Sequence, residues 1–299
     1  MSAVLNLATG WLHFLALTVS LGAVACRWVL LRRGVFDGDD ALAEARRTAA
    51  RLGVFTGLAL VVSFGLIFAR QLAEFRDPFV PLWEDVGLLV RGTSWGTTWA
   101  IGAAAAFLLP PAFALAARGR STGWVLATAL ALGLGVVPGL MGHANSGEMR
   151  ALTLPADVLH VWAVGAWIGG LATLLTLEAT RGAAPDGRTP SYLPDLVPRF
   201  SPMAITSVVV LGATGLLASW AHLPSVASLW TSSYGRLLMV KLALVAVVLA
   251  LGAVNFRRLT PRLGEEAGRS AMRRAATIEF LVANVVLAIT AIFVRTPPM

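Results

Sequence analysis

The sequence predicts an all-α membrane protein with eight transmembrane helices, and two observations support this. Hydrophobic residues make up 57% of the chain and charged residues only 13%, with a mean hydropathy of +0.74. The apolar residues also fall in long runs, and a run of about 20 helical residues crosses the roughly 30 Å of hydrocarbon in a bilayer. A soluble domain does not need so much apolar surface. We therefore expect one polytopic membrane domain over residues 1–299.

The apolar runs define the spans in order. The expected spans cover residues 5–31, 48–71, 95–117, 121–141, 153–178, 199–221, 234–255 and 273–294. We interpret the first run as a retained span and not a cleaved signal, because no basic residue precedes it. Pro110-Pro111 in the third span and Pro138 near the end of the fourth should kink or interrupt their helices, since proline lacks a backbone donor. The connections are short, so no soluble domain is expected.

Charge gives the orientation. The formal net charge is +8, from 23 arginines and one lysine scattered through short loops, which excludes a nucleic-acid-binding patch. Seventeen arginines lie in or beside the loops after the odd-numbered spans and six on the opposite face. Basic loops stay in the cytoplasm, so both termini are expected on the periplasmic side of a bacterial inner membrane. The single cysteine excludes a disulfide framework and a CxxC redox pair.

Short matching patterns in the two halves of the chain suggest an internal repeat. A histidine is followed nine residues later by a glycine in the first span and again in the fifth, and a hydroxyl-rich tetrapeptide ending in glycine opens the third and the seventh. The matching residues are His13 and Gly22, His160 and Gly169, and segments 93–96 and 232–235. These patterns predict a parallel four-plus-four duplication with halves 1–141 and 142–299.

Histidine and methionine residues suggest a metal site. His13 and His160 are expected at similar depth inside the membrane, where polar groups are costly unless paired or functional, and all four histidines fall on the outer side. Imidazole and thioether ligands suit soft metals and favour Cu(I) over Cu(II). The candidate copper ligands are His13, His160, His143, Met141, Asp157, Met149 and His222. The alternative for each intramembrane histidine is an ordinary interhelical hydrogen bond.

Three other polar residues within the spans have open roles. Asp157 lies one turn before His160, so it could orient His160 or ligate the metal beside it. The alternative is that Asp157 caps its helix. Lys241 either extends outward to the interface or neutralises Asp157. Glu279 is expected to form an interfacial ion pair with Arg51 or Arg199.

The remaining marked residues are expected to be structural. Trp167 packs beside Gly165 and Gly169, whose small-xxx-small spacing lets a neighbouring backbone approach closely. Cys26 is expected to be a buried, inert thiol.

The motifs resemble the copper resistance protein D family of bacterial inner-membrane proteins. The matching segments are residues 142–144, Asp157 with His160, residues 167–170, 199–201, 233–236, Lys241, Asn255, Glu279 and 296–298, so the resemblance is densest over residues 138–299. It implies copper handling, with uptake from periplasm to cytoplasm, and a periplasmic copper chaperone as a partner. This chain has no Met-rich tail or loop of its own, which leaves the copper source and direction open.

The expected function is therefore movement of copper, most consistent with import, through a periplasm-facing His/Met site. The chain carries no ATPase motif and no catalytic residues are assigned, so we expect flux down a gradient or coupled to an ion. The expected partners are the copper ion, the lipid bilayer and the chaperone, with the oligomeric state left open. Two alternatives are a membrane redox protein (a cupric reductase, or a haem or quinone protein using His13 and His160) and a copper sensor or scaffold that does not transport.

Overall fold

The computed structural model describes residues 3–36, 38–142, 149–181, 191–223 and 225–294. These residues form helices and turns, and no strand occurs among them. Eight helical segments are long and apolar enough to cross a membrane, which confirms the eight expected spans. The chain is thus a multi-pass membrane protein.

Short helices and tight turns accompany the long ones. The first half consists of α1 (Ala3–Val29), α2 (Asp39–Phe75), α3 (Leu82–Gly92), α4 (Ser94–Ala117), α5 (Ser121–Leu134) and α6 (Val137–Met141). The second half consists of α7 (Arg150–Val164), the π-helical turn η2 (Gly165–Gly169), α8 (Gly170–Ala179), α9 (Leu193–His222), α10 (Ser228–Thr231), α11 (Ser233–Val254), the π-helical turn η3 (Asn255–Leu259), the 3₁₀ turn η4 (Thr260–Arg262) and α12 (Glu266–Phe293).

Helix α3 lies in a segment that the sequence analysis treated as a loop. It was missed because 11 residues are too few to span a bilayer. A signal was nevertheless present, since Glu84 and Asp85 in the first turn favour a helix N-terminus. Its exposed Leu82 and Trp83 make one face of the helix apolar.

The prolines act differently from one another. Helix α4 continues through Pro110 and Pro111 without interruption, so these residues kink the helix at most. Pro110 is buried against α2, where a Cβ added to Gly57 would lie 3.0 Å from the Pro110 ring, so packing supports the helix there. Pro138, in contrast, follows the break between α5 and α6 and sits in the first turn of α6, where its missing N–H costs nothing. The interruption expected at Pro138 is therefore confirmed.

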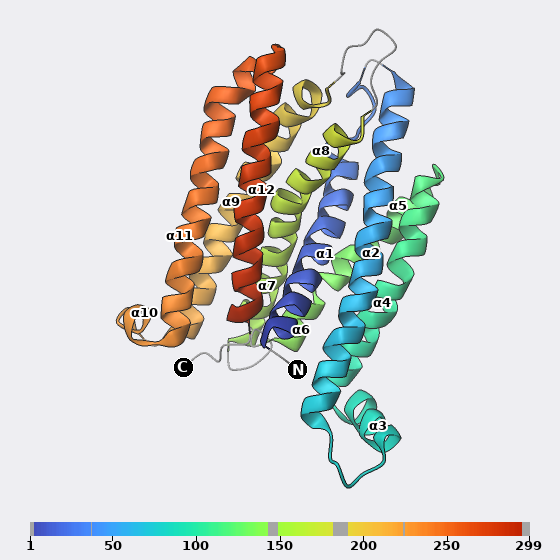
Figure 1. Ribbon diagram of the computed structural model, residues 1–299, viewed down its shortest axis with the longest axis vertical. Coiled ribbons are helices and arrows are strands. Elements are labelled where there is room, and N and C mark those ends of the chain that lie inside the picture. Colours follow the sequence, from blue (N-terminus) through green and yellow to red (C-terminus); the bar gives the residue numbers. More distant parts are fainter. Residues whose placement is uncertain (1–2, 37, 143–148, 182–190, 224, 295–299) are drawn as a thin grey trace.

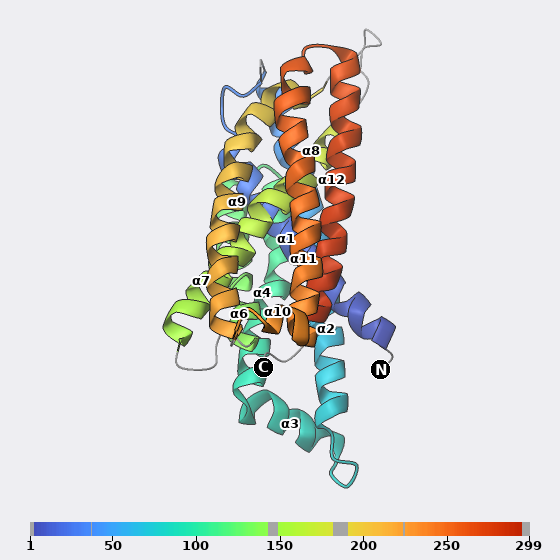
Figure 2. The ribbon, with the colours of Figure 1, turned by 90° about the vertical axis from the view of Figure 1, so that its left-hand side faces the viewer.

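Two central segments hold the bundle together. Helix α1 packs against η2 and α8, with α2, α4 and α5 on one side of this pair and α9, α11 and α12 on the other (Figures 1 and 2). The start of α1, the end of α12, α6 and α10 all lie at the same end of the bundle (Figure 1).

The central contact depends on glycine. A Cβ added to Gly22 would lie 1.9 Å from the carbonyl carbon of Gly169, and one added to Gly169 would lie 1.9 Å from the Thr18 oxygen. A Cβ on Gly165 would also meet the Leu21 side chain, at 2.4 Å. The predicted close backbone approach at Gly165 and Gly169 is thus confirmed.

Beside this contact lies the single cysteine. Cys26 is fully buried and its thiol donates a hydrogen bond to the Gly170 carbonyl oxygen, at 3.6 Å. A buried thiol with a local acceptor agrees with the structural role expected for it.

Candidate metal site

His13 lies inside the bundle between α1 and α2. Its side chain is buried, with edge-on contacts to the rings of Phe14 and Phe64. Its Nδ1 atom is 3.1 Å from the hydroxyl of Ser63 on α2. An intramembrane imidazole is therefore fixed at one nitrogen by a hydroxyl partner on the neighbouring helix.

The Ser63 hydroxyl determines which nitrogen of His13 carries the proton. Ser63 Oγ donates its only hydrogen to the Leu60 carbonyl oxygen, at 2.8 Å. When its hydrogen is used in this way, Ser63 accepts a hydrogen bond from Nδ1, and the proton of the neutral His13 ring is on Nδ1. In neutral imidazole this leaves the lone pair on Nε2, the form that binds a metal ion.

His160 has the same arrangement on the other side of the bundle. Its Nδ1 atom is 2.9 Å from the hydroxyl of Thr214 on α9, and Thr214 donates its own hydrogen to the Val210 carbonyl oxygen, at 2.7 Å. The same use of the Thr214 hydrogen puts the proton of a neutral His160 ring on Nδ1 and its lone pair on Nε2.

The two histidines lie equally far from the first residues of their helices. His13 is ten residues after the first residue of α1, and His160 is ten residues after the first residue of α7. At 1.5 Å per residue, each imidazole is about 15 Å along its helix. Both helices begin at the same end of the bundle (Figure 1).

Asp157 does not cap a helix, because α7 begins at Arg150 with Met149 at the N-cap position. That alternative is wrong, and Asp157 sits in the body of α7. The partner that fixes Nδ1 of His160 is Thr214. The Asp157 carboxylate instead lies against α6, where a Cβ added to Gly139 would be 2.9 Å from Oδ2.

Lys241 brings a positive charge close to this region. Its ammonium interacts electrostatically with both Asp157 and His160, and it lies 5.3 Å from the centre of the Phe293 ring. Of the two expected roles, neutralising Asp157 agrees with these contacts. A cation arriving at His160 would therefore experience attraction from Asp157 and repulsion from Lys241.

Two of the other candidate ligands, Met141 and Met149, are near the end of the bundle where α1 starts. Met141 ends α6 and Met149 precedes α7, and both side chains are partly buried. His143 lies outside the described residues. His222 is the last residue of α9, and its side chain also lies outside the described part. Within the described ranges, no three His, Cys, Asp or Glu side chains are grouped closely enough to hold a metal ion together.

Glu279 does not form the expected ion pair with Arg51 or Arg199. Its carboxylate accepts a hydrogen bond from Asn255 Nδ2 at 2.8 Å, and the Trp167 indole lies beside it in the same cavity. Trp167 and Asn255 belong to the π-helical turns η2 and η3, so each turn places a neutral side chain beside the same carboxylate. The expectation failed because it assumed a cation at the interface, whereas the widened turns provide uncharged partners inside the bundle.

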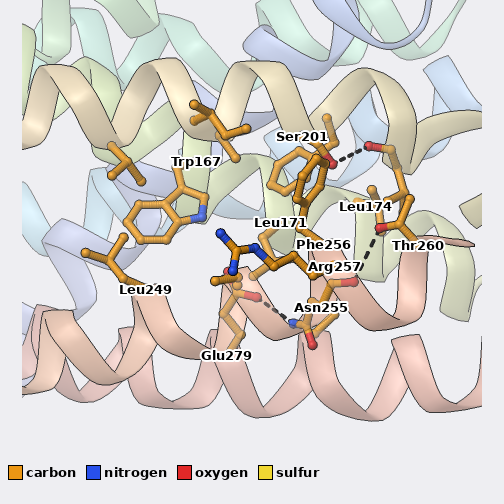
Figure 3. A pocket seen from close by; sticks show the side chains of 18 of the residues that line it. Trp167, Leu171, Leu174, Ser201, Leu249, Asn255, Phe256, Arg257, Thr260 and Glu279 are labelled. Carbon is orange, nitrogen blue, oxygen red and sulfur yellow. Dashed lines mark hydrogen bonds between the residues drawn. The ribbon is translucent and has the colours of Figure 1, made fainter.

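The Glu279 group forms part of a cavity of about 400 Å³ between α9, α11 and α12 (Figure 3). Trp167 lines this cavity together with Asn255 and Glu279, so its role extends beyond packing. Neither His13 nor His160 lines it.

The sequence analysis did not include Ser63, Thr214 or Asn255 among the candidate site residues. Ser63 and Thr214 have no sequence signature, because a hydroxyl in an apolar span usually bonds to its own helix. Asn255 was noted only within the family resemblance. A weak signal was available for it, since an asparagine inside an apolar span needs a partner.

Known families match both parts of the chain. The family described as "Copper resistance protein D-like, N-terminal domain" matches residues 1–151, and the family described as "Copper resistance protein D" matches residues 194–293. No solved structure matches.

Two curated proteins are similar to the chain. The "Copper transport protein CutJ" of Bacillus subtilis (strain 168) is 32% identical over 209 residues, which cover 69% of this chain and 37% of that protein. The "Copper resistance protein D" of Pseudomonas syringae pv. tomato is 28% identical over 235 residues, which cover 74% of this chain and 71% of that protein. The chain thus spans just over a third of the Bacillus protein and most of the Pseudomonas one.

Proposed function

Because the chain belongs to the copper resistance protein D family, we propose that it carries copper across the bacterial inner membrane, with import as the direction. The name of the Bacillus relative describes copper transport. His13 and His160 accept the ion from the periplasmic side. Met141, His143, Met149 and His222 act as outer capture ligands, and the ion is carried as Cu(I).

One observation supports this assignment most strongly. In both intramembrane histidines, Nδ1 pairs with a hydroxyl on a neighbouring helix that is also within hydrogen-bond distance of a backbone carbonyl oxygen. Metal-binding histidines are commonly fixed in this way, with one nitrogen held by an outer partner and the other free to ligate. The interhelical hydrogen bond uses Nδ1 alone. The lone pair on Nε2 is left over, and it favours a role as a metal ligand.

The distribution of arginines supports the orientation. Seventeen arginines lie in or beside the loops following odd-numbered spans, and those loops lie at the opposite end of the bundle from the start of α1. With that end in the cytoplasm, both termini are periplasmic and the outer ligands face the copper source. The chain carries no ATPase motif, so movement follows a gradient or is coupled to another ion.

Matching local structures support the parallel duplication. Thr93 caps α4 by accepting from the Gly96 N–H at 2.9 Å, and Ser232 caps α11 by accepting from the Gly235 N–H at 2.8 Å. Each cap hydroxyl also donates to a carbonyl four residues earlier, at 2.7 Å.

The central residues fit the same duplication. Gly22 and Gly169, the glycines nine residues after each histidine, contact each other where the two halves meet. The Ser63 and Thr214 partners correspond in the same way, one on the second helix of each half. We infer that His13 and His160 are equivalent positions of the two halves.

Cellular copper content tests the function. Cells that express the wild type should contain more copper, measured by mass spectrometry, than cells with an empty vector, and a His13→Ala/His160→Ala variant should abolish the increase. Leu159→Ala, beside His160 but half exposed toward lipid, is the matched control and should behave as wild type. Lower copper with the wild type would indicate export.

No difference between wild type, double variant and empty vector would refute transport and favour the redox or scaffold alternatives. A Soret band in the purified protein would then identify a haem protein, since a Cu(I) site is colourless.

A further inference from the structure

The cavity between α9 and α11 opens toward the lipid. Apolar residues around it are exposed on the protein surface, among them Ile205 (53% exposed), Val209 (65%) and Phe256 (49%). In a membrane, these side chains face hydrocarbon. A molecule that enters the cavity therefore comes from the bilayer and carries an apolar portion.

The inner part of the cavity is polar. Glu279, Asn255 and Trp167 are all buried, and Asn255 donates a hydrogen bond to the Glu279 carboxylate (Figure 3). Arg257 points into the cavity toward Trp167 and Glu279 (Figure 3). Figure 3 marks no hydrogen bond from its guanidinium to the other residues drawn, so its donors can meet a ligand.

The matching region of the first half is filled. There α2 and α4 pack closely, and a Cβ added to Gly53 would lie 2.4 Å from the ring of Phe113. Phe113 also contacts Trp124 edge-on, with the ring centres 5.9 Å apart. The Phe113 ring thus fills the space between α2 and α4, and Trp124 of α5 packs against it.

In the second half, no aromatic ring stands at the position that corresponds to Phe113. The capping residues Thr93 and Ser232 are 139 positions apart, and the same offset places Gly252 at the position of Phe113. Gly252 lines the cavity next to Glu279, where an added Cβ would lie 3.4 Å from Oε1. Helices α9 and α11 make almost no direct contact, so the second half keeps open the space that the first half fills.

Two π-helical turns contribute the polar groups. Trp167 lies in η2, and Asn255 and Arg257 lie in η3. Such turns are rare and occur frequently at functional sites, because they redirect side chains that a regular helix would place elsewhere. The cavity is thus a built site with its own polar groups.

The chemistry of the lining indicates the ligand class. A volume of about 400 Å³ is at the lower end of small-molecule sites, which span roughly 300–1,000 Å³. Trp167, Phe200 and Phe256 provide aromatic faces for a flat ring, and Arg257 provides donors for a carbonyl oxygen. A lipid phosphate fits less well, because Glu279 would repel its charge. We propose that this cavity binds the headgroup of an isoprenoid quinone, with the tail extending between α9 and α11 into the bilayer.

Photolabelling tests the proposal. Purified, metal-free protein in phosphatidylcholine nanodiscs is irradiated with an azido-quinone, and the labelled peptides are mapped by mass spectrometry. We expect labelling on α9 and η3 that decylubiquinone displaces and that short-chain phosphatidylglycerol does not. Displacement by phosphatidylglycerol alone would assign the cavity to a phospholipid, and label spread evenly over lipid-facing helices would refute a specific site.

Variants refine the test. Gly252→Phe puts an aromatic ring into the cavity, at the position that corresponds to Phe113 in the first half, and should weaken decylubiquinone binding about tenfold or more. Leu242→Phe is the matched control, since it adds the same ring on an exposed part of α11 outside the cavity and should leave binding unchanged. Arg257→Gln should also weaken binding, and it serves if Gly252→Phe fails to fold.

Wild-type binding by both Gly252→Phe and Arg257→Gln would overturn the proposal. Copper is absent throughout, so a failure here does not touch the transport proposal, and a failure of transport does not touch this one.

Discussion

Replacing Thr214 by valine tests whether the hydroxyl partner prepares His160 for metal. The Thr214 hydroxyl accepts from Nδ1 of His160 at 2.9 Å and donates to Val210 at 2.7 Å. Valine keeps the shape of the side chain and removes both bonds. His160 then loses the acceptor that holds its proton on Nδ1, and the Nε2 lone pair is no longer fixed.

The expected size follows from the number of bonds. One net hydrogen bond is worth about 0.5–1.5 kcal/mol. Removing an outer partner of a metal ligand typically costs about 10- to 100-fold in metal affinity. Because a tenfold change equals about 1.4 kcal/mol, we expect Cu(I) affinity to fall by about tenfold.

The assay is competition for Cu(I) against a colorimetric chelator, using the purified protein in detergent. Ser219→Ala is the matched control, because Ser219 also lies on α9 and its hydroxyl bonds to the Gly215 carbonyl oxygen at 2.8 Å. Thr214→Ser keeps the hydroxyl and should retain most of the affinity. The reasoning is refuted if Thr214→Val binds Cu(I) as tightly as Ser219→Ala, or if Thr214→Ser is as weak as Thr214→Val.

Three further predictions follow from the same contacts. Lys241→Gln removes a positive charge near His160 and should tighten Cu(I) binding several-fold, because like charges repel, and unchanged affinity would contradict it. Gly22→Val places a side chain where the η2 backbone already lies, so overpacking should lower the free energy of unfolding by about 1–3 kcal/mol. The thermal unfolding midpoint of the detergent-solubilised protein should fall accordingly, and a wild-type midpoint would disprove the close contact. Glu279→Leu leaves the Asn255 amide without its acceptor and should lower the free energy of unfolding by about 1–3 kcal/mol, more than Glu279→Gln does. Equal thermal unfolding midpoints for the two variants would argue against that hydrogen bond.

The sequence predicted the number of spans because hydropathy depends only on the length and polarity of each run. The second helix is longer than the expected span of residues 48–71, because α2 begins at Asp39 in a polar stretch that gives no hydropathy signal. It missed α3 because a short amphipathic helix gives no spanning signal. The distance of His13 and His160 along their helices could be estimated by counting residues, because a helix rises uniformly.

The partners of these residues could not be predicted. Whether His13 meets Ser63 depends on how α1 and α2 are rotated against each other, and the sequence does not give that rotation. The ion pair expected for Glu279 was wrong because η3 turns Asn255 inward, and a single π-helical turn has no reliable pattern in one sequence.

Copper flux through the purified protein tests the central claim most directly. Proteoliposomes containing the wild type should accumulate radioactive Cu(I) with time, and the His13→Ala/His160→Ala variant should match protein-free liposomes while Leu159→Ala matches the wild type. Equal accumulation by wild type and double variant would show that copper crosses without these histidines. No accumulation above protein-free liposomes by any of them would show that the chain alone does not carry copper.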